Sequence, residues 1–191
     1  MKTGIEFYLA EMPMYNDIKK KSSWSQDTID GLWETISNEV EDVEKYYLGS
    51  LNGERVYGFD MRQFWGAGGK SFQFFVLDKQ TPVFIATFFY QTEIRAWVED
   101  DVAKTKSRNS VEGLYDFLLT AKGVGFIPKR IAGQNHSKGM EKVWKKFTKF
   151  KKTEVWERSA KNNFTQRKDL NFHTKGIWSE VPNHFYVVIE K

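Results

Sequence analysis

The strongest chemical signal in the chain is a group of basic side chains directly before a predicted helix. Lys104, Lys106 and Arg108 precede a helix expected over 111–122, with Gly113 in its first turn. The first N–H groups of a helix have no partner within it and can bind an anion, and glycine lets the backbone approach closely. Guanidinium and ammonium groups add charge that pairs with phosphate. The pattern predicts a site for a phosphate-bearing ligand.

An ordinary surface loop is the alternative interpretation of the same residues. In that case the hydroxyl of Ser110 caps the helix and the basic side chains are simply solvated. Val111 weakens the phosphate interpretation, because its β-branched side chain hinders part of the backbone approach.

Carboxylates near the end of the strand before this loop are candidates for proton transfer. They are Glu93, Glu99 and Asp100, in and after a strand expected over 92–99. Because side chains alternate along a strand, Glu93 and Glu99 are expected on the same face. Either could accept a proton from an amine. The alternative is that both only offset the charge of Arg95 and the basic loop.

His136 is a third candidate, because imidazole exchanges protons near neutral pH. A histidine that only caps the following helix is the alternative. The other histidines, His173 and His184, lie at no spacing that would bring two metal ligands together, so no metal site is predicted. The chain has no cysteine, which excludes disulfides, thiolate metal sites and a cysteine nucleophile.

The elements that must position these residues are predicted from hydrophobic periodicity and turn signals. Helices are expected from Asp27 or Thr28 to about residue 48, over 111–122 and over 138–150. Strands are expected over 4–9, 55–62, 71–91 (two strands around the turn 78–81), 92–99, 130–133, 153–158 and 184–190.

Length and composition predict one domain over residues 1–191, in a soluble, cytoplasmic protein without a membrane span. The charge is uneven. Residues 1–100 hold 10 Lys and Arg against 16 Asp and Glu, and the remainder hold 19 against 9. A basic C-terminal half favours an anionic partner, such as nucleic acid or an acidic protein, although a solvated lysine-rich face is the alternative.

The order of elements resembles that of the GNAT (GCN5-related N-acetyltransferase) superfamily. The family's loop pattern, Gln/Arg-x-x-Gly-x-Gly/Ala, would fall on residues 108–113, where Arg108 and Gly113 match and Val111 departs from it. Residues 131–135 with the helix after them are similar to the family's fifth strand, its Asn (here Asn135) and its fourth helix. The resemblance implies a mixed, mostly antiparallel α/β (α+β) sheet that is splayed and flanked by helices.

The same resemblance implies an acyl-CoA-dependent N-acyltransferase with acetyl-CoA or another acyl-CoA as donor. Lys104, Lys106, Arg108, Gly113 and Asn135 would bind the cofactor. Glu93, Glu99 and His136 would be catalytic. The family often has a proton-donating Tyr on the fourth helix, where this chain has Trp144, so Tyr115, His136 and Ser137 are the nearby substitutes.

Two other functions stay open on the same fold. One is modification of a nucleic-acid base, as in divergent viral GNAT-like proteins that alter adenine in DNA. Phe64 and Trp65 could then hold an unstacked base. The other is a non-catalytic protein that binds nucleic acid or an acidic protein through its basic half.

Overall fold

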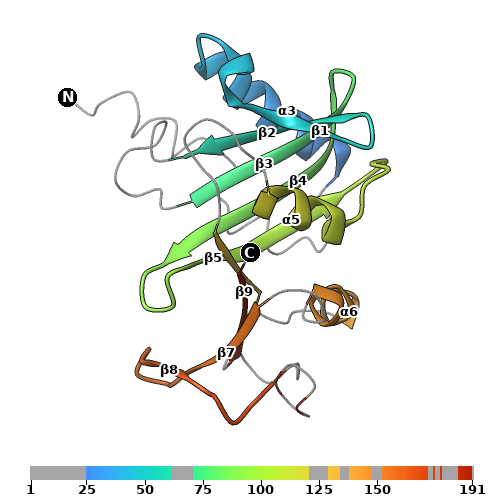
Figure 1. Cartoon of the computed structure of the whole chain (residues 1–191). Coiled ribbons are helices and arrows are strands. Elements are labelled where there is room, and N and C mark those ends of the chain that lie inside the picture. Colours follow the sequence, from blue (N-terminus) through green and yellow to red (C-terminus); the bar gives the residue numbers. More distant parts are fainter. Residues whose placement is uncertain are drawn as a thin grey trace, which may run out of the picture.

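The computed structural model describes residues 25–61, 71–120, 129–133, 138–147, 152–171, 174, 177 and 185–190. Figure 1 shows their arrangement. The helices are α3 (Gln26–Glu39), the 3-10 helix η1 (Val43–Tyr46), α5 (Val111–Thr120) and α6 (Lys138–Phe147). The strands are β1 (Tyr47–Leu51), β2 (Glu54–Asp60), β3 (Ser71–Asp78), β4 (Thr81–Gln91), β5 (Ala96–Lys104), β6 (Arg130–Gly133), β7 (Lys152–Arg158), β8 (Phe164–Gln166) and β9 (Phe185–Glu190).

These nine strands form one sheet in the order β1-β2-β3-β4-β5-β6-β9-β7-β8. Every neighbouring pair is antiparallel except β5 and β6, which are parallel. A parallel pair needs a crossover, and α5 provides it on one face of the sheet. The prediction of a mixed, mostly antiparallel sheet flanked by helices is confirmed.

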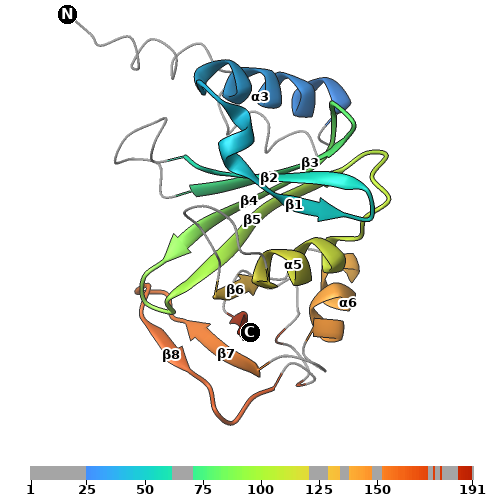
Figure 2. The same ribbon diagram turned by 45° about the horizontal axis from the view of Figure 1, so that its top comes forward.

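Helices cover both faces of the sheet, with α3 on one face and α5 on the other, as Figure 2 shows. The alternation of strand residues decides which side chains meet each helix. On β3, Phe75 and Leu77 pack in the cluster that includes Ile29 and Ile36 of α3. Phe72, Phe74 and Val76 of the same strand pack with Leu114, Leu118 and other residues of α5. Both faces of β3 and β4 are therefore buried, as their long apolar runs predict.

The hairpin of β3 and β4 and the later elements, apart from β5 and β8, agree with the sequence within a few residues. Strands β6, β7 and β9 and helices α5 and α6 all lie where they are expected, while β8 was not predicted. The expected strand over 4–9 and the final residues of both predicted helices (121–122 and 148–150) lie outside the described residues.

The prediction for residues 27–48 is wrong at both ends. Ser25 is the N-cap of α3, accepting a hydrogen bond from the Thr28 N–H at 3.2 Å, and the helix ends at Glu39. The chain then forms η1 and strand β1, which turns into β2 through Asn52 and Gly53, both at positive φ. Asn-Gly is the preferred pair for such a hairpin turn, because the turn needs positive φ at both positions. This hairpin carries Glu54 to the loop before α5.

Candidate active site

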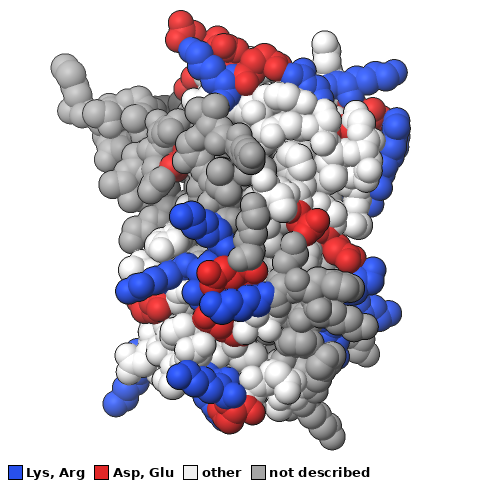
Figure 3. All heavy atoms as spheres, viewed as in Figure 1, with Lys and Arg blue, Asp and Glu red and all other residues white. Residues whose placement is uncertain are grey.

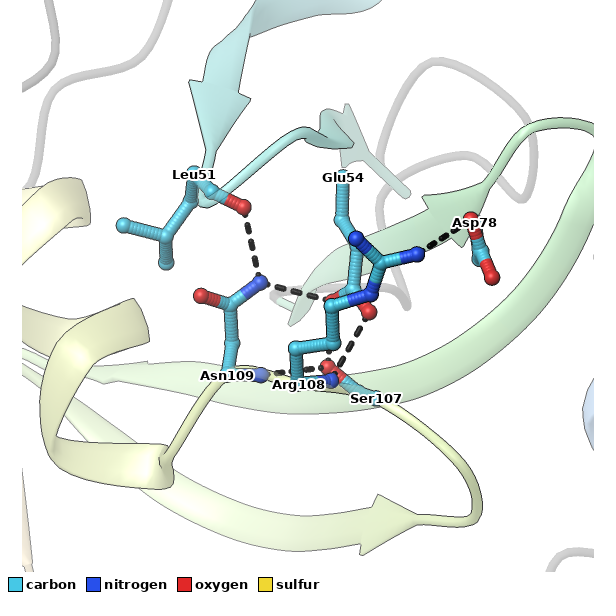
Figure 4. Close-up of polar contacts among 6 residues, drawn as sticks. All are labelled: Leu51, Glu54, Asp78, Ser107, Arg108 and Asn109. Atoms are coloured by element: carbon cyan, nitrogen blue, oxygen red, sulfur yellow. Dashed lines mark hydrogen bonds and ion pairs between the residues drawn. The ribbon is translucent and has the colours of Figure 1, made fainter.

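The loop between β5 and α5 is organised around a carboxylate from another part of the chain, as Figure 4 shows. Glu54, the first residue of β2, is fully buried. Its carboxylate accepts hydrogen bonds from the Ser107 hydroxyl at 2.5 Å, the Arg108 N–H at 2.8 Å and the Asn109 amide at 2.6 Å. Burial alone would raise the pKa of Glu54, but these three hydrogen bonds outweigh it and hold the pKa below its ordinary value. Glu54 of β2 is therefore a carboxylate anion that binds residues 107–109 of the loop.

Asn109 connects the same loop to the β1–β2 hairpin through side-chain hydrogen bonds. Its amide also donates to the Leu51 carbonyl at 2.9 Å, and its side-chain oxygen accepts from Asn52 at 2.8 Å. The Asn109 side chain is completely buried. Glu54 and Asn109 were not among the predicted site residues. The local signal for them is the Asn52-Gly53 turn, which places the start of β2 next to the loop.

The three basic residues predicted at this loop all lie on its exposed side. Lys104 is exposed and its ammonium donates to the Asn109 carbonyl at 2.5 Å, so part of its role is to brace the loop. Lys106 is exposed as well. Arg108 has a guanidinium 67% exposed that lies 3.8 Å from the carboxylate of Asp78. Lys106 and Arg108 can therefore meet an anion that approaches from solvent.

Helix α5 begins with a serine cap. The Ser110 hydroxyl accepts a hydrogen bond from the Gly113 N–H at 3.0 Å, and its carbonyl accepts from Leu114 at 3.0 Å. A Cβ at Gly113 would lie 3.2 Å from the Ser110 hydroxyl, so the glycine leaves room for the cap. The cap expected under the surface-loop alternative is present. The first-turn N–H groups of Val111 and Glu112, which precede Gly113, are candidate donors to an anion.

A second group of polar residues lies where β5 and β6 part. These strands pair only through Trp97 with Ile131 and Val98 with Ala132, although β5 continues to Lys104. Glu99 is the next residue of β5 and is 6% exposed. Its carboxylate accepts a hydrogen bond from the hydroxyl of Tyr115, a fully buried residue of α5. Strand β5, at the end of its pairing with β6, and helix α5 thus meet at one carboxylate.

The strand β5 also carries a bulge at this point. Phe88 of β4 pairs with Glu99 and Thr87 pairs with Asp101, so Asp100 is the extra residue of the bulge. A bulge re-aims the strand and its side chains. The third predicted carboxylate, Asp100, therefore lies at the irregularity next to Glu99.

Glu93 does not lie on this strand. The predicted strand over 92–99 is wrong in its first half, because residues 92–95 form a turn between β4 and β5. The turn includes Arg95 at positive φ, and Glu93 is exposed and accepts a hydrogen bond from Gln91. Glu93 and Glu99 therefore do not share a strand face. Asn135 and His136, together with Ser137, Phe64 and Trp65, lie outside the described residues.

Aromatic side chains enclose Tyr115 above Glu99. Its ring centroid lies 5.4 Å from Phe88, 5.8 Å from Trp144 and 6.0 Å from Phe147. Trp144 of α6 is fully buried against Gly133, the last residue of β6. A Cβ on Gly133 would lie 2.0 Å from the Trp144 ring, so only glycine fits there.

Charges on the molecular surface are mixed. Figure 3 shows Lys and Arg spread over one face with acidic side chains between them. Several cations of the C-terminal half form ion pairs. Arg130 lies 2.6 Å from Glu154, and Lys146 lies 3.0 Å from Glu112. On the face in view, the basic residues do not form a single patch of the kind that a polyanion would need.

Two classes of site find no candidate in the described residues. No three His, Asp or Glu side chains in this part of the chain gather as metal ligands. None of the helices described has both the length and the apolar character that crossing a membrane requires.

Comparison with known proteins gives one loose structural likeness. No protein-family model matches the chain, and no curated protein matches it in sequence. The chain is similar to a solved structure from Bacteroides thetaiotaomicron that is provisionally assigned as an acetyltransferase of the GNAT family. The similarity covers 83% of this chain and 84% of the other chain. The identity is 13% and the TM-score 0.35. A likeness at this level does not establish the family.

Proposed function

We propose that the chain is an acyl-CoA-dependent N-acyltransferase of a single GNAT-like domain. The observation that carries the proposal is the parting of the parallel strands β5 and β6 immediately before the buried Glu99. The strand that parts from its neighbour also leads into the basic loop and the N-terminus of α5. A ligand with a phosphate at one end and a reactive group at the other would span these two places.

The donor groups at the loop fit the phosphates of such a ligand. The cations of Lys106 and Arg108 face solvent, and the first-turn N–H groups of α5 lie beside them. Glu54 holds the loop backbone from beneath, which fixes these donors before a ligand arrives. Acyl-CoA would supply a thioester whose carbonyl carbon is open to attack by an amine.

The role of Glu99 in this proposal is to accept a proton from the amine. The Tyr115 hydroxyl donates to the carboxylate and fixes its orientation, while burial at the parting of the strands keeps water away. The acyl group, the acceptor amine and the cytoplasmic location remain expectations from the sequence. The mixed surface of Figure 3 gives no support to the nucleic-acid alternatives.

The test is acetyl-CoA binding by calorimetry, together with release of free thiol in the presence of a panel of amines. Replacing Glu99 by Gln should leave acetyl-CoA affinity nearly unchanged and lower turnover by roughly 10² to 10⁴, the range for general acid–base catalysis. Glu93→Gln is the matched control, because Glu93 is exposed in a turn. A wild-type chain that binds no acetyl-CoA, or a Glu99→Gln variant with full turnover, would refute the proposal.

A further inference from the structure

The side chain of Trp144 carries a buried hydrogen-bond donor without an acceptor. Trp144 is fully buried, and in the described structure its indole N–H has no hydrogen-bond partner. Buried tryptophan usually finds a partner for this group, and leaving a buried donor unpaired costs about 1–3 kcal/mol. An orphaned donor of this kind requires an explanation.

The indole lies at the end of the pairing between β5 and β6. A Cβ on Gly133 would be 2.3 Å from the indole nitrogen, so the N–H edge of the ring rests on the backbone of this residue. Gly133 directly follows Ala132, the last residue of β6 that pairs with β5. If the parallel register continued by one residue, Gly133 would face Glu99. The unpaired donor and the buried carboxylate therefore lie at the same end of the β5–β6 pairing.

Tyr115 connects the two groups. Its ring packs against the indole with 5.8 Å between centroids, and its hydroxyl donates to Glu99. Glu99 accepts a hydrogen bond from the Tyr115 hydroxyl. The described residues provide no acceptor for the Trp144 N–H, and a bound ligand can.

We infer that the Trp144 N–H donates a hydrogen bond to the carbonyl oxygen of an acyl thioester bound where β5 and β6 part. The inference rests on the proposed function and adds a positioning residue that fixes the thioester beside Glu99. Indole cannot give up its proton near neutral pH, so Trp144 orients and polarises the carbonyl without transferring a proton.

The experiment compares two ligands that differ only in that carbonyl, acetyl-CoA and S-ethyl-CoA, by calorimetry. The wild-type chain should prefer acetyl-CoA, and Trp144→Phe should reduce this preference by about 3- to 10-fold, as expected for one hydrogen bond between uncharged groups. Trp156→Phe is the matched control, because the Trp156 indole already donates to Glu154 at 2.8 Å. It should keep the wild-type preference.

A second measurement needs no substitution at the site. In the nitrogen-15 spectrum of the wild-type chain, the Trp144 indole proton, assigned through its contact with Gly133, should move downfield with acetyl-CoA and much less with S-ethyl-CoA. An unmoved resonance, or an unchanged preference in a folded Trp144→Phe variant, would overturn the inference while leaving acyl-CoA binding intact. Failure of the wild-type chain to bind either ligand would overturn both the inference and the proposed function.

Discussion

Replacing Glu54 by Gln should destabilise the chain far more than the loss of one exposed charge. The carboxylate is fully buried, with one oxygen accepting from the Arg108 N–H and the other from Ser107 and Asn109. An amide keeps one acceptor but turns an NH₂ group toward the Asn109 amide, which is also a donor. Hydrogen bonds to charged groups contribute about 1.5–3 kcal/mol each, so losing the charge and one acceptor should cost about 3 kcal/mol of unfolding free energy.

Urea denaturation followed by circular dichroism and tryptophan fluorescence measures this effect. With an m-value of about 1–3 kcal/mol/M, a loss of about 3 kcal/mol lowers the midpoint by about 1 M or more. In a thermal melt the shift should be about 6–12 °C for a chain of this size.

Glu44→Gln is the matched control. Glu44 also accepts hydrogen bonds from two side chains, Arg55 and Tyr57, but its own side chain is 54% exposed. Exposed ion pairs contribute at most about 1 kcal/mol. Equal midpoints for the two variants would refute the argument that Glu54 is the buried centre of the loop.

Three further outcomes follow from the same contacts. The stability from the depressed pKa of Glu54 is complete above its unfolded-state pKa, near the ordinary value of 4.5, and is lost as the pH falls through the lower folded-state pKa. The urea midpoint of Glu54→Gln should therefore fall less steeply in acid than that of the wild-type chain. Gly133→Ala should lower the melting temperature, because the new Cβ would be 2.0 Å from the Trp144 ring. Adding Trp144→Leu should recover part of the loss. A Gly133→Ala variant as stable as the wild-type chain would contradict the packing. Arg108→Glu should weaken acetyl-CoA binding by about 1.5–3 kcal/mol in calorimetry without changing the urea midpoint, and an unchanged affinity would remove Arg108 from the cofactor site.

Local signals explain most of what the sequence could predict about the fold. Alternation and apolar runs locate β3, β4 and β9, because burial on one or both faces imposes a pattern within a few residues. The prediction of a helix to residue 48 is wrong because apolar residues such as Val43 keep a helical spacing past Glu39. The chain there forms η1 and then β1. The Asn52-Gly53 pair is the local evidence for that hairpin.

The site was harder to predict, because its contacts join distant residues. The basic loop was found from its own composition, yet the Glu54 carboxylate that organises it lies more than 50 positions earlier in the chain. Glu99 was a candidate from its place on a strand, but nothing local indicated that Tyr115 would donate to it. Glu93 was misplaced because the turn at residues 92–95 contains neither Gly nor Pro to mark it.

The attachment of the loop to Glu54 has a consequence for the order in which the molecule opens. Residues 105–110 have no regular secondary structure and three of their side chains are exposed charged or polar groups, features that usually mark early local unfolding. Here the Arg108 N–H donates to Glu54 of β2, so we expect its hydrogen exchange to follow the opening of the β1–β2 hairpin. The irregular segment 105–110 should thus open together with β1 and β2. Loosening the β1–β2 hairpin would then release the N-terminus of α5.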